Sequence, residues 1–105
     1  MLSSSYENQS ELVETMRIDI SKFGKTLISR PAGRDAFLSA RAYNIPKDGD
    51  ELIELDFSSV QVLTPSWADE FIRGLKEEFG ASRINIIEGG NLSVHMTFET
   101  LRAAV

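Results

Sequence analysis

The segment Pro65–Phe79 constrains the fold most, because every local signal along it predicts one amphipathic α-helix. Apolar side chains recur at intervals of three and four residues, and charged side chains occupy the other face. Thr64 can cap the first turn, Pro65 suits the first helical position and Gly80 suits the exit. The stripe that we expect to be buried consists of Trp67, Ala68, Phe71, Ile72, Leu75 and Phe79.

A second amphipathic helix is predicted from residues 29–31 to about residue 43, since a serine able to cap precedes a proline tolerated in the first turn. A last, less regular segment from residue 94 onward also has helical spacing. Gly74 costs the Pro65–Phe79 helix about 1 kcal/mol relative to alanine, which suggests a close approach by a strand or a partner. The buried stripe expected for the 29–43 helix is Gly33, Ala36, Phe37, Ala40 and Tyr43.

Short apolar stretches between the helices predict strands. Residues 15–20 alternate polar and apolar side chains, as an edge strand does, and residues 26–28 resume an extended pattern after a glycine turn, which favours a hairpin. Residues 52–57 predict a central strand, and residues 83–88 predict another. This alternation predicts an α/β domain with a mostly parallel, four- to five-stranded mixed sheet and about three helices packed on it.

Composition limits the class of protein. With 42% hydrophobic and 26% charged residues among 105, the chain is typical of a globular protein with one core. The absence of cysteine excludes disulfides and thiolate sites and favours a reducing compartment, so we expect a cytoplasmic protein. We expect residues 1–12 to form a flexible tail and residues 13–105 to form a single domain. The net charge of -5 repels phosphate, and we expect neither nucleic acid nor a membrane as a partner.

No constellation of residues predicts catalysis. The single histidine, His95, has Glu99 one turn later, which favours a surface ion pair over a general base. Gly89 and Gly90 lack the rest of a phosphate-binding fingerprint, and they favour a tight turn. For Asp56, at the end of the predicted central strand, a functional carboxylate and a carboxylate bonded to loop amides are equally open. We expect no enzymatic activity, no metal and no cofactor.

Two motifs resemble a known family. Residues 55–60 read Leu-Asp-Phe-Ser-Ser-Val, and residues 63–71 read Leu-Thr-Pro-Ser-Trp-Ala-Asp-Glu-Phe. Together they resemble the central signature of the STAS-like family of uncharacterised bacterial domains, in which an Asp-Phe strand end leads through a serine-containing loop to a helix opening Ala-Asp-Glu. Ser29 and Arg30 also resemble the start of that family's first helix. The resemblance covers about residues 16–100 and implies a small STAS-like sandwich.

More distantly, the chain is similar to true STAS domains, which include anti-anti-sigma factors and the cytoplasmic tails of sulfate transporters. In those antagonists the strand-to-helix loop carries Asp-Ser-Ser-Gly, and a partner anti-sigma kinase phosphorylates its second serine. Ser66 matches that serine and Thr64 replaces the aspartate, whereas Pro65 replaces the first serine and Trp67 the glycine. The resemblance implies a phosphorylation candidate at Ser66 and a partner that is a histidine-kinase-like ATPase or an anti-sigma factor.

Two functions therefore stay open. The first is a regulatory protein-binding module of a bacterial signalling system, with a surface centred on residues 58–67 and the exposed face of the following helix. The second is a small-ligand or nucleotide sensor that uses the strand ends with Arg30, Gly89 and Gly90. Pairing of two copies through the early edge strand is open as well. The candidate phosphorylation or partner-binding residues are Asp56, Ser58, Ser59, Thr64, Ser66, Asp69, Glu70 and Arg73.

Overall fold

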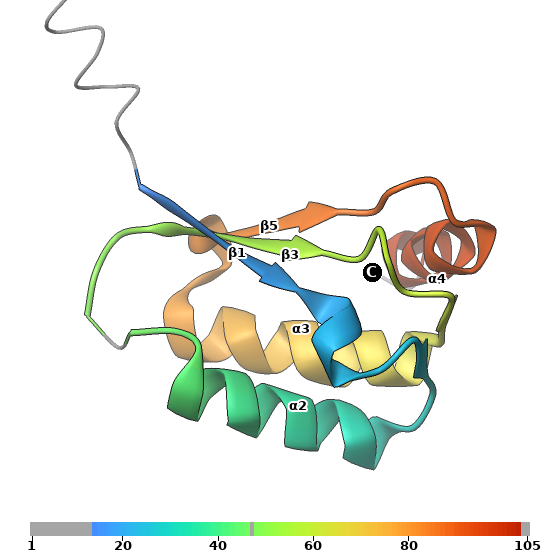
Figure 1. Cartoon of the computed structure of the whole chain (residues 1–105), viewed down its shortest axis with the longest axis horizontal. Helices are drawn as coiled ribbons and strands as arrows, with labels where there is room; N and C mark the ends of the chain where they lie inside the picture. Colours follow the sequence, from blue (N-terminus) through green and yellow to red (C-terminus); the bar gives the residue numbers. More distant parts are fainter. Residues whose placement is uncertain (1–13, 47, 104–105) are drawn as a thin grey trace, which may run out of the picture.

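The computed structural model describes residues 14–46 and 48–103 (Figure 1). The expected tail at residues 1–12 lies outside the described residues. The described part consists of short strands alternating with three α-helices, with two short 3-10 helices between them. In chain order the elements are β1 (Thr15–Asp19), η1 (Ile20–Phe23), β2 (Thr26–Leu27), α2 (Arg30–Tyr43), β3 (Leu52–Asp56), β4 (Val62–Leu63), α3 (Pro65–Phe79), η2 (Ala81–Arg83), β5 (Ile84–Ile87) and α4 (Leu92–Ala103).

The strands form two parallel sheets, a three-stranded sheet in the order β1-β3-β5 and a two-stranded sheet of β2 and β4. Three sequence predictions are confirmed: the α/β class, the edge position of the first strand and the central position of β3. The predicted hairpin between the first two strands is wrong, because β1 pairs with β3 while β2 pairs with β4. In place of the expected turn the chain forms the short helix η1, whose first turn is capped by Asp19. Gly24 follows its last residue and has a φ of 132°.

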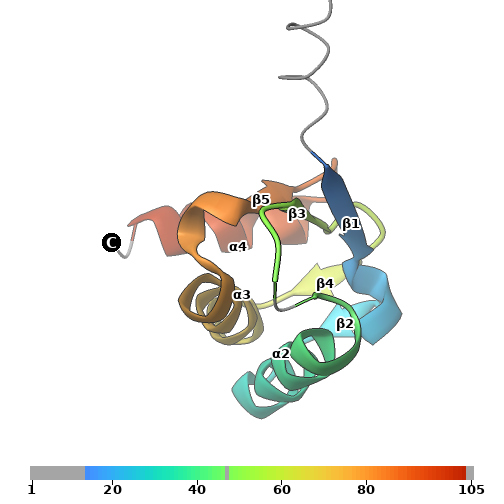
Figure 2. The same cartoon turned by 90° about the vertical axis from the view of Figure 1, so that its left-hand side faces the viewer.

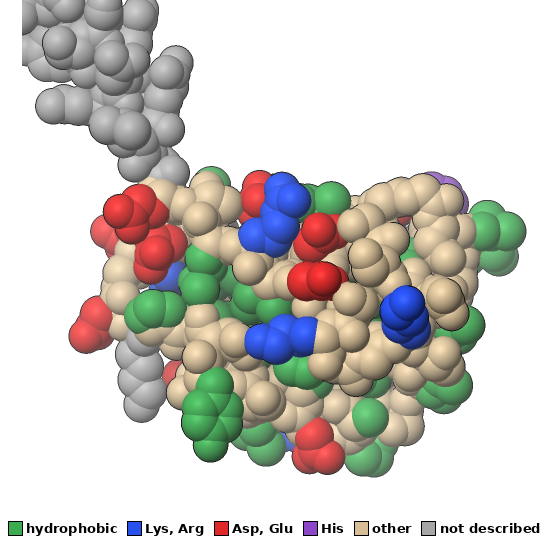
Figure 3. All heavy atoms as spheres, viewed as in Figure 1, with side chains coloured by type: hydrophobic (Ala, Val, Ile, Leu, Met, Phe, Trp, Pro, Cys, Tyr) green, Lys and Arg blue, Asp and Glu red, His purple; other side chains and the backbone are tan. Residues whose placement is uncertain are grey.

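The two faces of the three-stranded sheet differ in chemistry. Ile18, Ile53 and Leu55 are buried on the face turned toward α2 and α3, which lie side by side beneath the strands (Figures 1 and 2). The opposite face carries the ion pair between Arg17 and Glu54, with Nη2 and Oε1 3.3 Å apart. No described helix covers that face. On the side viewed in Figure 3, acidic and basic side chains are interspersed over the surface.

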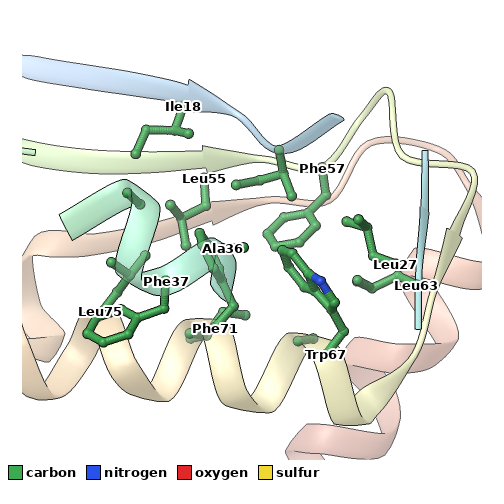
Figure 4. Packing of buried hydrophobic residues seen from close by; sticks show 14 of the residues in the cluster. Ile18, Leu27, Ala36, Phe37, Leu55, Phe57, Leu63, Trp67, Phe71 and Leu75 are labelled. Atoms are coloured by element: carbon green, nitrogen blue, oxygen red, sulfur yellow. The ribbon is translucent and has the colours of Figure 1, made fainter. Parts of the chain in front are cut away.

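An aromatic group fills the core between α3 and the strands. Trp67 stacks on Phe71 with ring centroids 4.9 Å apart, and Phe23 from η1 lies 5.5 Å from Phe71. The exposed fraction of Trp67 is 1%, and the whole predicted stripe of α3 is buried. Figure 4 shows Trp67, Phe71 and Leu75 of this stripe. In α2 the stripe is confirmed except at Tyr43, which is 85% exposed. The chain turns away just after Tyr43, and Ile45 is buried in its place.

Helices α2 and α3 approach each other closely at two glycines. A Cβ atom at Gly33 of α2 would lie 2.6 Å from the carbonyl oxygen of Trp67. A Cβ atom at Gly74 of α3 would lie 2.8 Å from ring atoms of Phe37. The close approach expected at Gly74 therefore exists, but a neighbouring helix makes it rather than a strand or a partner. This contact fixes the start of α2 beside the start of α3, where the candidate site lies.

Candidate functional site

The central strand β3 and its neighbour β1 end in the same local structure. Asp19 and Asp56 lie side by side in the register of β1 and β3. Each carboxylate accepts two hydrogen bonds from the serine two residues later; for Asp56 the distances are 3.0 Å to Ser58 N and 2.6 Å to Ser58 Oγ. The hydroxyl and the backbone N–H of Ser58, helped by the charge of Arg17, hold the pKa of Asp56 below its ordinary value. Of the two interpretations of Asp56, this geometry matches the carboxylate bonded to its own loop.

The turn after β3 is exposed and rests on the end of β5. Ser58 and Ser59 are both exposed, and the N–H of Val60 closes the turn by donating to Phe57 O at 3.0 Å. Gly89 packs against the backbone of Ser58, whereas nothing lies within 4 Å of a Cβ atom built at Gly90. Both glycines are exposed. Glycine at position 89 thus lets the end of β5 and the serine turn approach each other, and the chain bends at Gly90.

Thr64 fastens the start of α3 to β2. Its side-chain oxygen accepts a hydrogen bond from Trp67 N at 3.3 Å, which is the expected N-cap, and it donates to the carbonyl oxygen of Ile28. Its backbone N–H donates to Leu27 O at 3.0 Å. Because the hydroxyl both accepts and donates within the domain, Thr64 is a structural anchor of the loop. Ser66, two positions later, faces solvent.

Ser66 is exposed in the first turn of α3. Its backbone N–H and its hydroxyl have no hydrogen-bond partner among the residues that the structure describes. Pro65 before it has no N–H, and Thr64 caps the N–H of the residue after it. An exposed serine hydroxyl beside a free amide at the positive end of a helix dipole is accessible to another protein and favourable for an added negative charge.

A cluster of charged residues joins α2 to α3 one turn beyond Ser66. We call Arg30, Arg34, Asp69, Glu70 and Arg73 the arginine cluster. Arg30 Nη1 donates to Asp69 Oδ2 at 2.9 Å and to Glu70 Oε1 at 3.0 Å, which raises the pKa of Arg30. Arg73 lies 3.1 Å and Arg34 3.9 Å from Glu70. With three arginines and two carboxylates the cluster carries one net positive charge, although the whole chain carries -5.

The arginines of this cluster are also its outermost groups. The side chains of Arg30, Arg34 and Arg73 are about half exposed, at 48%, 54% and 52%, whereas that of Glu70 is only 16% exposed. A protein that approaches this side of α3 therefore meets guanidinium groups first. Asp69 and Glu70 do not make this side of α3 acidic, because α2 supplies the opposite charges.

The predicted site residues fall into two groups. One group lies at the start of α3 and comprises Thr64, Ser66, Asp69, Glu70 and Arg73, which Arg30 joins from α2. The other lies at the strand ends and comprises Asp56, Ser58, Ser59 and Gly89, with Gly90 beside them. Arg30 is bonded to α3, and the start of α2 lies apart from the loop between β5 and α4 (Figure 1). The structure therefore does not bring Arg30 close to Gly89 and Gly90.

Sequence reasoning missed Arg34 and the part that Arg30 plays beside Asp69. These two residues are 39 positions apart, and no local pattern indicates their contact. The one available signal was the pair of glycines, Gly33 and Gly74, since small residues on two amphipathic helices allow the helices to pack closely. That signal predicts contact between the helices but not which charges meet.

His95 lies apart from both groups, in a surface cluster with two glutamates. His95 Nδ1 lies 3.3 Å from Glu88 and its Nε2 lies 3.7 Å from Glu99, as in the surface pair that the sequence favoured. Within residues 14–46 and 48–103, no group of three metal-ligating side chains comes together. None of the described helices has both the length and the apolar character needed to cross a bilayer.

A family model described as "STAS-like domain of unknown function (DUF4325)" matches residues 42–93. The match runs from the end of α2 to the start of α4 and includes both motifs quoted from the sequence. No curated protein and no solved structure matches the chain.

Proposed function

The chain belongs to the STAS-like domains of unknown function, and from this premise we propose that it is a regulatory protein-binding module of a bacterial signalling system. The binding surface is the exposed start of α3 at Ser66 together with the arginine cluster. The observation that carries the proposal is the combination of an exposed, unbonded serine and a solvent-facing group of arginines on one helix. Binding is favoured over catalysis because, among the described residues, Ser66 and the three arginines lie on the exposed surface of the molecule.

The partner should present an acidic surface. The three guanidinium groups are half exposed, and the two carboxylates that would repel an acidic protein already serve as their partners. Arginine is suited to such contacts because its planar group can bond two carboxylates at once. By resemblance to the anti-anti-sigma factors, the partner is a histidine-kinase-like ATPase or an anti-sigma factor of the same cytoplasm.

Phosphorylation of Ser66 would act as the switch. On a helix, residues three and four positions after Ser66 lie on the same side, and these are Asp69 and Glu70. A phosphate on Ser66 would compete with both carboxylates for Arg30 and would add negative charge to a surface that otherwise attracts acidic groups. We therefore expect the modified form to release the partner.

The ligand-sensor alternative has less support. It needs Arg30 near Gly89 and Gly90, but Arg30 is engaged by Asp69 and Glu70. Gly89 also packs directly on the Ser58 backbone. A thermal-shift screen against nucleotides and anions tests this alternative, since a ligand that binds only the folded state must raise its stability.

The test of the proposal is calorimetric titration of each purified histidine-kinase-like ATPase and anti-sigma factor of the same organism into the wild type, Arg73→Ala and Arg102→Ala. Arg102 is a matched control, because it is an exposed arginine bonded to two carboxylates, Glu88 and Glu99, on another helix. We expect one candidate to bind, with Arg73→Ala weakening it about fivefold or more and Arg102→Ala leaving it unchanged. Binding by none of them, or equal loss in both variants, would overturn the proposal.

A further inference from the structure

A groove separates β2 from α2 on the part of the molecule next to the proposed binding surface. Its volume is about 310 Å³. Its lining includes Leu27 and Ile28 at the end of β2, Ala32 and Ala36 of α2, and the aromatic residues Phe23 and Trp67. Figure 4 shows the indole of Trp67 between Leu27 and Ala36. None of Ser66, Arg30, Arg34 or Arg73 lines this groove, so it is distinct from the surface proposed above.

Strand β2 has an open edge at this groove. Its bonds to the β4 side use Lys25 O, which accepts from Val62 N at 3.0 Å, and Leu27 O, which accepts from Thr64 N at 3.0 Å. Backbone groups of a strand alternate in direction, so the N–H and C=O of Thr26 between them point away from β4. Among the residues that the structure describes, neither group of Thr26 has a hydrogen-bond partner.

The other edge of the same small sheet is closed. Ser93 Oγ of α4 accepts a hydrogen bond from Leu63 N at 3.1 Å, and Thr97 Oγ1 donates to Leu63 O at 2.5 Å. Side chains of α4 thus take the place of a third strand next to β4. Because β4 is satisfied and β2 is not, the two-stranded sheet can gain a strand on the groove side only.

The groove also holds groups that select an occupant. Ile28 is 54% exposed although it is large and apolar, and it offers contact area beside the open edge. No hydrogen bond joins the indole N–H of Trp67 to another described residue, and Trp67 lines the groove. Asp35 is the one charged residue that lines the groove, and its carboxylate makes no ion pair within the described part of the chain.

We propose that this groove binds an extended peptide segment that adds to β2 as a strand, with apolar side chains against Ile28 and Trp67 and a basic side chain on Asp35. Main-chain hydrogen bonds to Thr26 supply the register, as in other proteins that bind a peptide by extending a sheet. The length from Thr26 to Ile28 accommodates about three residues of the peptide at about 3.3 Å each. A single unpaired carboxylate on an otherwise uncharged lining favours a basic side chain over an acidic one.

The probes are three synthetic peptides. The first is acetyl-Thr-Val-Arg-Val-Thr-amide, the second is the same peptide with methylated backbone nitrogens, and the third has glutamate in place of arginine. Each is titrated into the ¹⁵N-labelled full chain, and amide shifts report binding residue by residue. We expect saturable shifts at Thr26, Ile28 and the Trp67 indole N–H with the first peptide, and at least about fivefold weaker binding of the other two.

The variants separate the parts of the proposal. Asp35→Asn should remove the preference for the arginine peptide over the glutamate peptide. Asp48 is an exposed aspartate outside the groove, so Asp48→Asn should keep that preference. Equal binding of the methylated peptide would overturn strand addition, and an unchanged preference in Asp35→Asn would overturn the charge assignment. Absence of shifts in the groove with all three peptides would overturn the proposal as a whole. None of these results depends on Ser66 or on the arginine cluster, so this proposal and the proposed function fail separately.

Discussion

Gly89 and Ser58 meet so closely that a Cβ atom at position 89 would lie 2.6 Å from Ser58 Cα and 2.7 Å from Ser58 Cβ. Gly89 also has φ of 81°, a conformation that side chains rarely adopt. The contact joins the end of β5 to the serine turn after β3. The position of Ser58, and through it the environment of Asp56, therefore depends on glycine at position 89.

Gly89→Ala should destabilise the domain by about 2 kcal/mol or more, because backbone strain adds to a collision with main-chain atoms. Gly90→Ala is the matched control, since the space around a Cβ atom there is open. Chemical denaturation of both variants measures the difference in the free energy of unfolding. Equal stability of the two would show that the contact with Ser58 is not tight.

Trp67→Ala should lower the free energy of unfolding by about 3 to 5 kcal/mol, because it empties the largest fully buried side chain of the core. Ser66→Ala, one residue earlier and exposed, should change it by about 0.5 kcal/mol or less. Circular dichroism is the suitable probe, since the variant loses the single tryptophan. Near-native stability of Trp67→Ala would mean that the side chain serves binding instead.

The carboxyl of Asp56 should titrate below its ordinary value of 3.8, chiefly because Ser58 donates to it from its hydroxyl and its backbone N–H. A lowered pKa in the folded state means that this contribution to stability is present above pH 3.8 and is lost as the pH falls through the folded-state pKa. Ser58→Ala should move the pKa of Asp56 toward the ordinary value and cost about 1 kcal/mol at neutral pH.

Carboxyl ¹³C shifts followed against pH measure that pKa directly in the wild type, Ser58→Ala and Ser59→Ala. The Ser59→Ala control should keep the wild-type value, since the hydrogen bonds of Asp56 come from Ser58. The stability difference between wild type and Ser58→Ala should also shrink as the pH falls below 3.8. The same pKa in Ser58→Ala and the wild type would contradict the assigned cause.

Periodicity alone predicts most of the fold. The bounds of α3 follow from a threonine cap, a proline at the first position and an apolar stripe, all of which are local. Strand β4 cannot be predicted from local signals, because it consists of only two residues, Val62 and Leu63. Its partners, β2 and side chains of α4, come from distant parts of the chain. The wrong hairpin has the same origin, because parallel pairing joins residues that are far apart in the sequence.

The candidate site is predictable to a smaller extent. Exposure of Ser66 follows from its place in the first turn of a capped helix, opposite the apolar stripe. The reversal of charge around Asp69 and Glu70 does not, since it depends on arginines that α2 brings across a helix contact. Tyr43 shows the limit within one helix, because periodicity cannot indicate that the chain turns and buries Ile45 instead.

The central claim is that the start of α3 binds a partner and that negative charge at Ser66 releases it. The measurement is the dissociation constant of the partner for Ser66→Asp and for Ser82→Asp, an identical exchange at an exposed serine beyond the other end of α3. We predict that Ser66→Asp weakens binding at least about tenfold, or about 1.4 kcal/mol, while Ser82→Asp stays within about twofold of the wild type. Unchanged affinity of a folded Ser66→Asp variant would contradict the account.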